Sequence, residues 1–202
     1  MEIRVPAKKR AAKKKRKKFD RAKVEKAVRL LLEGVGEDPS RDGLVETPRR
    51  VAGFYEEILS GMGVDPAKYL VPLTTDYAQD IVIVKDIGFV SICEHHMLPF
   101  MGRVHVGYVP DGGKLVGVSK IVRAVDAVAG RLQIQERMTA ELADAIDSKL
   151  RPAGVLVLIE AEHLCMTIRG VKKPGALMVT SEARGVLQEP DRQALAISSF
   201  RR

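Results

Sequence analysis

Two short segments hold most of the residues in this chain that could bind a metal ion. The sequence has two cysteines and four histidines, and all but one of these six residues lie in Cys93-Glu94-His95-His96 or in His163-Leu164-Cys165. Thiolate sulfur and imidazole nitrogen are ligands that Zn²⁺ prefers, in tetrahedral geometry. The two segments therefore predict a zinc site to which distant parts of the chain contribute.

The spacing within each segment agrees with such a site. Cys93 and His96 are three residues apart, so a tight turn would bring both to one ion, and Leu98-Pro99 disfavours a continuing helix. His163 and Cys165 would point to the same face of a β-strand. Two cysteines and one histidine give three protein ligands, the number typical of a catalytic zinc with an open fourth position.

Two other interpretations of the cysteines remain. They could be inert buried thiols, but the grouping of five candidate ligands in two short clusters argues against this interpretation. They could also form a disulfide, but the sequence has no recognisable signal peptide to indicate an oxidising compartment. A metal site is the preferred interpretation.

Positive charge is concentrated at the N-terminus. The formal net charge is +8, and residues 1–18 alone hold ten Lys or Arg and one Glu, so the rest of the chain is nearly neutral. The first 18 residues are expected to form a disordered extension, with an anionic partner for residues 4–18 as the alternative. The remainder has no apolar run near 18 residues, which predicts a cytoplasmic globular protein without a membrane span.

The apolar periodicity predicts an α+β domain with an antiparallel sheet. Helices are expected from Asp20 to Gly34, from Thr47-Pro48 to Gly61, from an N-cap at Ser119 to about Ala129, and from Gln135 to Leu150. Strands are expected at 81–84, 89–92, 103–109 and 114–118, and as one long strand from Gly154 to Arg169. The expected organisation is a tail over residues 1–18, a helical segment over 19–72 and a catalytic domain over 73–202.

Lys120 and Arg123 fall on the first turn of the helix expected after Ser119. Two cations at a helix N-terminus, where the helix dipole favours anions, suggest a phosphate site. The alternative is an ordinary solvated face, which is the commoner fate of such a pair.

Five motifs in this order resemble the GTP cyclohydrolase I family. They are Glu46-Thr47-Pro48-Arg49-Arg50-Val51-Ala52, Cys93-Glu94-His95-His96, Gly117-Val118-Ser119-Lys120-Ile121-Val122-Arg123, Arg131-Leu132-Gln133-Ile134-Gln135-Glu136-Arg137, and the segment 160–171. The resemblance runs from about Asp20 to Leu187. It implies the tunnelling fold with paired helices, in which pentamers join their sheets into a barrel and two pentamers stack as a homodecamer. It also implies zinc-dependent conversion of GTP and water to formate and 7,8-dihydroneopterin triphosphate.

The resemblance further implies a role for each matching residue. The metal ligands would be Cys93, His96 and Cys165, with a bound water attacking purine C8. His163 and His95 would carry protons. Gln135 and Glu136 would recognise the guanine, with Glu136 as a buried carboxylate. The triphosphate would be held by Ser119, Lys120, Arg123 and Arg169, joined by Arg50 from a neighbouring subunit.

Two alternative functions are weighed against this one. The first is the nitrile reductase of queuosine biosynthesis, a different enzyme on the same fold that uses a cysteine nucleophile and NADPH. The Cys93-Glu94-His95-His96 run argues against it. The second is a non-enzymatic zinc-stabilised protein that binds nucleic acid through residues 4–18, which the spare histidine beside each ligand segment disfavours.

Overall fold

The computed structural model describes residues 18–76 and 80–200. The chain forms two compact units, the first ending at Ala52 and the second beginning at Gly53. Residues 1–17 of the predicted basic tail lie outside the described residues, so the anionic partner stays a prediction, as does the division of function between 19–72 and 73–202. Among the described residues, no helix has the length and apolar character needed to cross a bilayer.

The first unit contains α1 (Arg21–Gly34) and the start of α2 (Thr47–Ile58). α1 begins where the sequence predicts, because the Asp20 carboxylate accepts a hydrogen bond from the backbone N–H of Lys23 at 3.0 Å and caps the helix. It ends at the predicted Gly34. α2 begins at the predicted Thr47-Pro48 pair and ends at Ile58, three residues before the expected stop.

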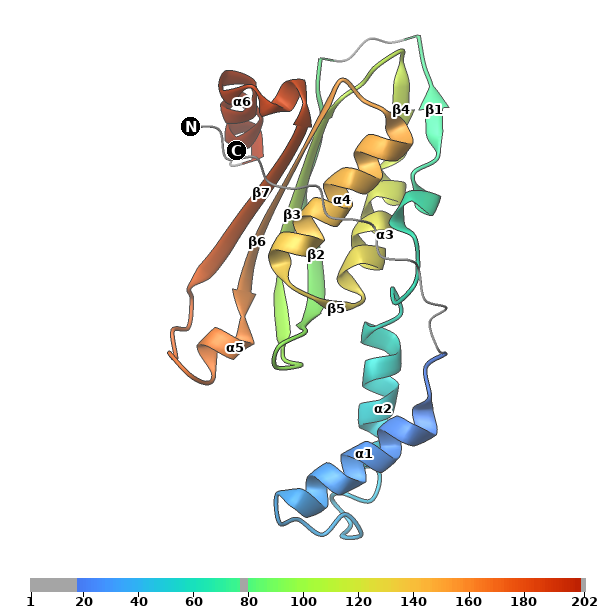
Figure 1. Ribbon diagram of the computed structural model, residues 1–202, viewed down its shortest axis with the longest axis vertical. Helices are drawn as coiled ribbons and strands as arrows, with labels where there is room; N and C mark the ends of the chain where they lie inside the picture. The colour runs from blue at the N-terminus through green and yellow to red at the C-terminus, as the bar shows by residue number, and fades with distance from the viewer. Residues whose placement is uncertain (1–17, 77–79, 201–202) are drawn as a thin grey trace, which may run out of the picture. The chain divides into compact units, whose positions relative to one another are not determined.

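The second unit is built on a five-stranded sheet with strand order β5-β2-β3-β6-β7 (Figure 1). Its strands are β2 (Val82–Cys93), β3 (Pro99–Val109), β5 (Leu132–Gln133), β6 (Gly154–His163) and β7 (Leu177–Gly185). All neighbours pair antiparallel except β5, which runs parallel to the end of β2. The predicted α+β class is confirmed, and the sheet differs from a purely antiparallel one at this edge. A separate antiparallel pair joins β1 (Pro72–Thr74) to β4 (Lys114–Val116).

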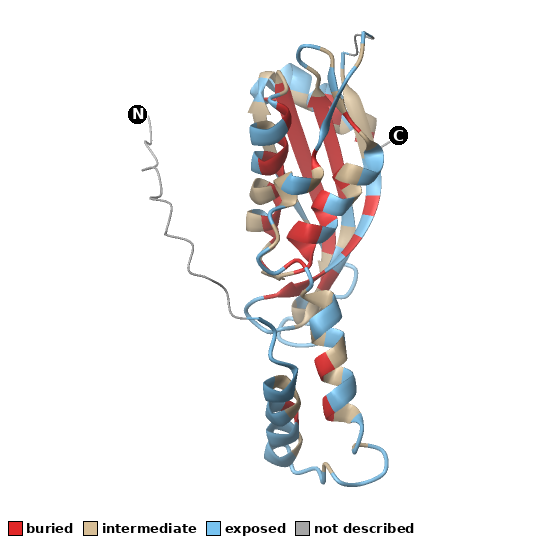
Figure 2. Ribbon diagram, turned by 90° about the vertical axis from the view of Figure 1, so that its right-hand side faces the viewer, coloured by how far each residue is buried: buried red, intermediate tan, exposed pale blue. Residues whose placement is uncertain are grey.

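Two long helices pack against the sheet, α3 (Val118–Ala129) and α4 (Gln135–Leu150) (Figure 1). One face of α4 carries a buried apolar stripe, whose residues Met138, Leu142, Ile146 and Leu150 are all at most 1% exposed. They share one apolar cluster with strand residues such as Phe100 and Val157. Figure 2 shows the buried residues running along the central strands and the helix faces that meet them. The core therefore fixes the strands whose ends carry the candidate ligands.

The opposite face of the sheet is covered in part by α6 (Pro190–Phe200). Alternate residues of a strand point to opposite faces, so Val157 of β6 joins the main cluster while Leu156 and Leu158 pack with Phe200 in a second one. The short helices η1 (Pro66–Tyr69) and η2 (Val186–Gln188) complete the unit together with α5 (Leu164–Thr167). Neither β7 nor α6 was predicted from the sequence.

Two elements differ from their predicted bounds because of local backbone geometry. β2 is one strand where two were predicted, at 81–84 and 89–92, because a bulge between Val84 and Ile87 keeps the intervening residues within the strand, with Asp86 at a φ of +59°. The N-cap of α3 is Gly117 instead of the predicted Ser119, which lies in the first helical turn. The helix already includes Val118, so it begins before Ser119, the residue whose side chain could have capped it.

The strand predicted from Gly154 to Arg169 was wrong beyond His163. There the chain turns into α5, in which the Thr167 hydroxyl donates to the backbone carbonyl of His163 at 3.2 Å and to the Glu162 carboxylate at 3.0 Å. These local hydrogen bonds give the backbone an alternative to a sheet ladder. Cys165 and Arg169 therefore do not share a strand face with His163.

Candidate metal centre

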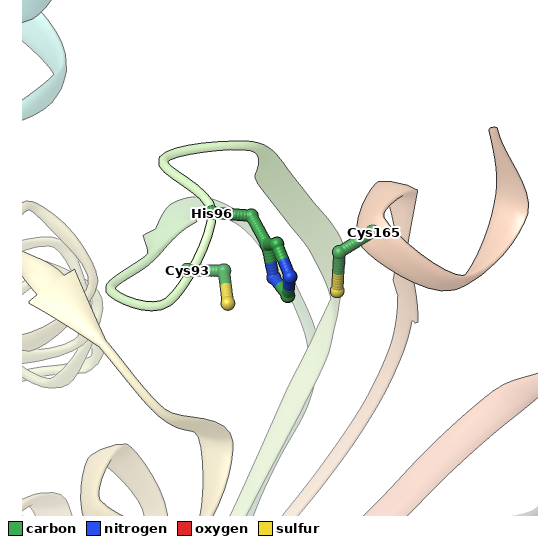
Figure 3. Close-up of side chains that lie close together, drawn as sticks. All are labelled: Cys93, His96 and Cys165. Atoms are coloured by element: carbon green, nitrogen blue, oxygen red, sulfur yellow. The ribbon is translucent and has the colours of Figure 1, made fainter. Parts of the chain in front are cut away.

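Cys93, His96 and Cys165 come together at one end of the five-stranded sheet. Cys93 is the last residue of β2, His96 lies on the turn between β2 and β3, and Cys165 lies on α5 directly after β6. Their candidate ligand atoms all lie within 4.8 Å of one another. Figure 3 shows the imidazole of His96 between the sulfur atoms of the two cysteines. The three residues predicted as ligands are thus close enough to hold a metal ion.

Strand register explains why residues so distant in sequence meet. Phe100 at the start of β3 lies opposite Ser91 of β2 on one side and opposite His163 of β6 on the other. The ends of β2 and β6 therefore flank β3, and the segments that leave them emerge close together. The predicted tight turn is present, since the Met97 N–H donates to the Cys93 carbonyl at 2.9 Å.

The donor set fits a thiophilic divalent cation such as Zn²⁺. Zinc bonds of about 2.3 Å to sulfur and 2.0 Å to nitrogen in a tetrahedron place ligand atoms about 3.5 Å apart, so a small adjustment within the 4.8 Å cluster suffices. Burial raises the pKa of the Cys165 thiol, and the neighbouring Cys93 raises it further. A bound cation would offset both effects and stabilise the two thiolates.

His96 has a partner that the sequence did not predict. A guanidinium nitrogen of Arg169 lies 2.7 Å from Nε2 of His96. Because a guanidinium has no acceptor, Nε2 must accept, and a neutral ring then carries its proton on Nδ1. His96 can bind a cation only after one ring nitrogen has been freed. Metal and Arg169 therefore compete for this imidazole, and metal binding would leave Arg169 available for another acceptor.

His163 is a buried histidine two residues before Cys165. Its ring stacks on Phe100, with the centroids 4.6 Å apart and the planes 5° from parallel. Burial lowers the pKa of His163, an effect that the nearby Glu136 carboxylate partly opposes. The imidazole is therefore neutral near pH 7 and able to accept a proton.

Gln135 fixes which nitrogen of His163 carries the proton. The Gln135 amide nitrogen lies 3.0 Å from the backbone carbonyls of Ile159 and Met178 and 3.1 Å from the Thr180 hydroxyl. Since carbonyls only accept, the amide nitrogen must face them, and its oxygen then faces His163 Nε2 at 2.8 Å. Nε2 therefore donates, which leaves Nδ1 as the free ring nitrogen.

This arrangement bears on two residues predicted to recognise guanine. Gln135 is 1% exposed and its side chain already bonds His163, so its contact with the guanine stays a prediction. Glu136 was expected to be buried, but in this chain it is exposed on the first turn of α4. Its carboxylate acts electrostatically on His163, raising the pKa of that ring. His95 is also exposed, with its ring centroid 6.4 Å from that of His96.

Three of the five residues predicted to hold the triphosphate share one helix, α3, and the other two, Arg50 and Arg169, lie elsewhere in the chain. Ser119, Lys120 and Arg123 lie near the N-terminus of α3, and Arg123 lines a pocket of about 400 Å³ together with Tyr69 and Asp126. Arg50 lies on α2 in the first unit. Their contacts with substrate stay predictions.

Two sets of contacts that the sequence did not predict hold the ligand segments in place. Glu94 and Arg137 form an ion pair of 2.6 Å between the β2–β3 turn and α4. The Glu162 carboxylate accepts from the Thr167 hydroxyl and from the backbone N–H of Gly175, both at 3.0 Å, and these hydrogen bonds lower its pKa. Glu94 is 43 residues from Arg137, so local spacing gave no signal of this pairing.

The fold and the site define an α+β protein with a Cys/His/Cys group able to hold a metal ion. The sequence profile of GTP cyclohydrolase I matches residues 24–200. The GTP cyclohydrolase 1 of Pelotomaculum thermopropionicum is 55% identical over 171 residues, which cover 85% of this chain and 91% of that protein. That of Bacillus subtilis is 51% identical over 173 residues, with coverage of 86% and 91%. The chain belongs to the GTP cyclohydrolase I family and is an enzyme of this type.

Family membership sets aside both alternative functions, the nitrile reductase and the non-enzymatic nucleic-acid-binding protein. A distant structural similarity is to an archaeosine synthase QueF-like protein in its apo form, with a TM-score of 0.44 and 16% identity. The match covers 54% of this chain and 97% of that one. A similarity this low assigns neither fold nor function.

Proposed function

We propose that this chain converts GTP and water to formate and 7,8-dihydroneopterin triphosphate at a zinc centre formed by Cys93, His96 and Cys165. The observation that carries the proposal is the convergence of these three ligands beside the buried, neutral His163 in a member of this family. A zinc ion held there would act as a Lewis acid and lower the pKa of a bound water to about 7.

His163 serves as the principal proton carrier in this proposal. Its Nε2 is committed to Gln135, so Nδ1 exchanges protons with the purine during ring opening. The stacking on Phe100 holds the ring in one orientation, which keeps Nδ1 in a fixed position. His95 is a second proton carrier, suited to this by its exposure on the turn next to His96.

Charge complementarity supports the proposed substrate contacts. Glu136 presents a carboxylate near His163, where it can accept hydrogen bonds from the N–H donors of guanine. The triphosphate is assigned to Ser119, Lys120, Arg123, Arg169 and Arg50. Arg169 suits this role because a metal at His96 displaces it from the imidazole, and phosphate oxygens then offer the guanidinium a new acceptor.

Incubating the purified, zinc-loaded protein with GTP should release formate and a pterin that becomes fluorescent after oxidation. Removal of the metal by a chelator should stop both products, and adding zinc back should restore them. ATP is the matched control, since adenine lacks the donors that Glu136 would recognise. Absence of formate and pterin from metal-loaded protein would contradict the proposed reaction.

We also propose that the chain works as a homo-oligomer with the tunnelling fold, formed from barrel-making pentamers. β7 lies at one edge of the five-stranded sheet, and it exposes Leu177 at 62% and Val179 at 55%. An exposed apolar edge strand is a ready template for pairing with another chain. Light scattering on the active protein should therefore give a multimeric mass, and full activity in a monomer would exclude this assembly.

A further inference from the structure

The turn that carries Cys93 and His96 is tied to the body of the second unit through Glu94. A carboxylate oxygen of Glu94 accepts from a guanidinium nitrogen of Arg137 on α4 at 2.6 Å. The backbone N–H of Glu94 donates to the carbonyl of Gln133 at 3.0 Å, just beyond the point where β5 pairs with the end of β2. Hydrogen bonds to α4 and β5 thus hold both the side chain and the backbone of Glu94, the residue that follows Cys93.

Arg137 connects this turn to β5. Its Nε donates to the Gln133 side-chain oxygen at 2.8 Å, and the nitrogen that binds Glu94 also donates to the Leu132 carbonyl at 2.9 Å. Leu132 and Gln133 are the two residues of β5, so one guanidinium joins α4, β5 and the β2–β3 turn.

The side-chain amide nitrogen of Gln133 is also held by hydrogen bonds. Arg137 can only donate, so the Gln133 oxygen must face it, and the amide nitrogen faces the Val128 carbonyl and the Glu141 carboxylate, both at 3.1 Å. Glu141 in turn accepts from Arg131 at 2.9 Å. Gln133 is 1% exposed, and a buried amide satisfied on both ends resists displacement. Gln133, to which Arg137 is hydrogen-bonded, is therefore held in place by residues of α3 and α4.

We propose that Arg137 is a positioning residue for the metal centre, holding the turn so that Cys93 and His96 face Cys165. The need for such a residue follows from the chain's path: His96 lies on an exposed turn, whereas Cys165 comes from α5. Three ligands must agree to within about 0.5 Å to bind one ion well. This inference rests on the zinc centre of the proposed function.

The test compares the zinc affinity of the wild-type protein with that of Arg137→Met. Methionine keeps an unbranched side chain but removes the guanidinium hydrogen-bond donors. Zinc affinity, measured by competition with a chromogenic chelator, should fall about 10- to 100-fold, as is typical when an outer partner of a metal ligand is lost. The absorption bands of a Co²⁺-substituted sample should change shape, because they report coordination geometry. Asp144→Asn is the matched control. Asp144 lies on α4, as Arg137 does, and the change breaks its 2.8 Å ion pair with Arg184 of β7.

Glu94→Gln provides a second variant on an exposed residue, so the test does not depend on Arg137→Met folding. If both act through one ion pair, the double variant should lose little more affinity than the worse single one. Unchanged zinc affinity in both folded single variants, or an equal loss in Asp144→Asn, would overturn the role of Arg137 alone. Failure of the wild-type chain to bind zinc or Co²⁺ would overturn the zinc centre itself.

Discussion

Cys165→Ser is expected to abolish zinc binding and, with it, formation of the pterin. A serine hydroxyl does not ionise near neutral pH, so the variant keeps only two of three protein ligands. The loss in zinc affinity should exceed the 10- to 100-fold typical of an outer partner, because a bond to the metal itself is removed. Cys165 is the better cysteine to replace, because it is half-buried on the short α5, whereas Cys93 is 6% exposed and part of the main core.

Metal content by atomic emission after gel filtration, measured beside pterin fluorescence, checks this expectation. Circular dichroism should show an unchanged fold. Met166→Ser is the matched control: it introduces the same side chain on the same helix at a residue that is not a candidate ligand. A Cys165→Ser protein that still holds about one zinc per chain and turns over GTP would remove Cys165 from the ligand set.

His163→Ala is expected to keep its zinc and lose most of its turnover. The three ligands remain, but the ring nitrogen that exchanges protons is gone, and general acid–base help is commonly worth about 10²- to 10⁴-fold. His96→Ala should differ by losing zinc as well. The contrast between these two histidines tests the assignment of roles, because His96 is itself a candidate ligand, whereas His163 lies two residues before one, Cys165.

The effect of losing the packing between His163 and Phe100 must be distinguished from the effect of losing the proton-carrying nitrogen of His163. Phe100→Leu removes the stacked ring while leaving the imidazole and its bond to Gln135, so this variant should retain much more activity than His163→Ala. Turnover and metal content should be measured for all three variants on the same preparations. If His163→Ala loses zinc as completely as His96→Ala, His163 is part of the metal centre and not a separate proton carrier.

The candidate ligand set could be read from sequence because its members are chemically rare and clustered. Cys93 and His96 stand three residues apart, and the turn they predict is the one observed, closed by the Met97 N–H on the Cys93 carbonyl. Helix α4 was equally predictable, since an amphipathic stripe is a local property of 16 consecutive residues. Local spacing and residue type carry this information without knowledge of the rest of the chain.

The path predicted for the chain after His163 was wrong. The alternation that suggested a strand to Arg169 gives way to α5, because Thr167 and Glu162 form hydrogen bonds that a strand would not allow. In the same way, two strands were predicted at 81–84 and 89–92, although a bulge keeps the residues between them within one strand, β2. Such competition between local hydrogen bonds and a sheet ladder depends on neighbouring strands, which the sequence does not show.

By itself, the sequence determined which residues could bind a metal, where the first four α-helices lie, and which family the five motifs resemble. Only the tertiary structure decided how Cys165 reaches Cys93, which nitrogen of His163 is free, and which residues hold the ligand-bearing turn. Each of these depends on strand register or on a hydrogen bond such as that between Glu94 and Arg137, 43 residues apart. Contacts at that separation form only when the sheet assembles, because no local rule of spacing relates the two residues.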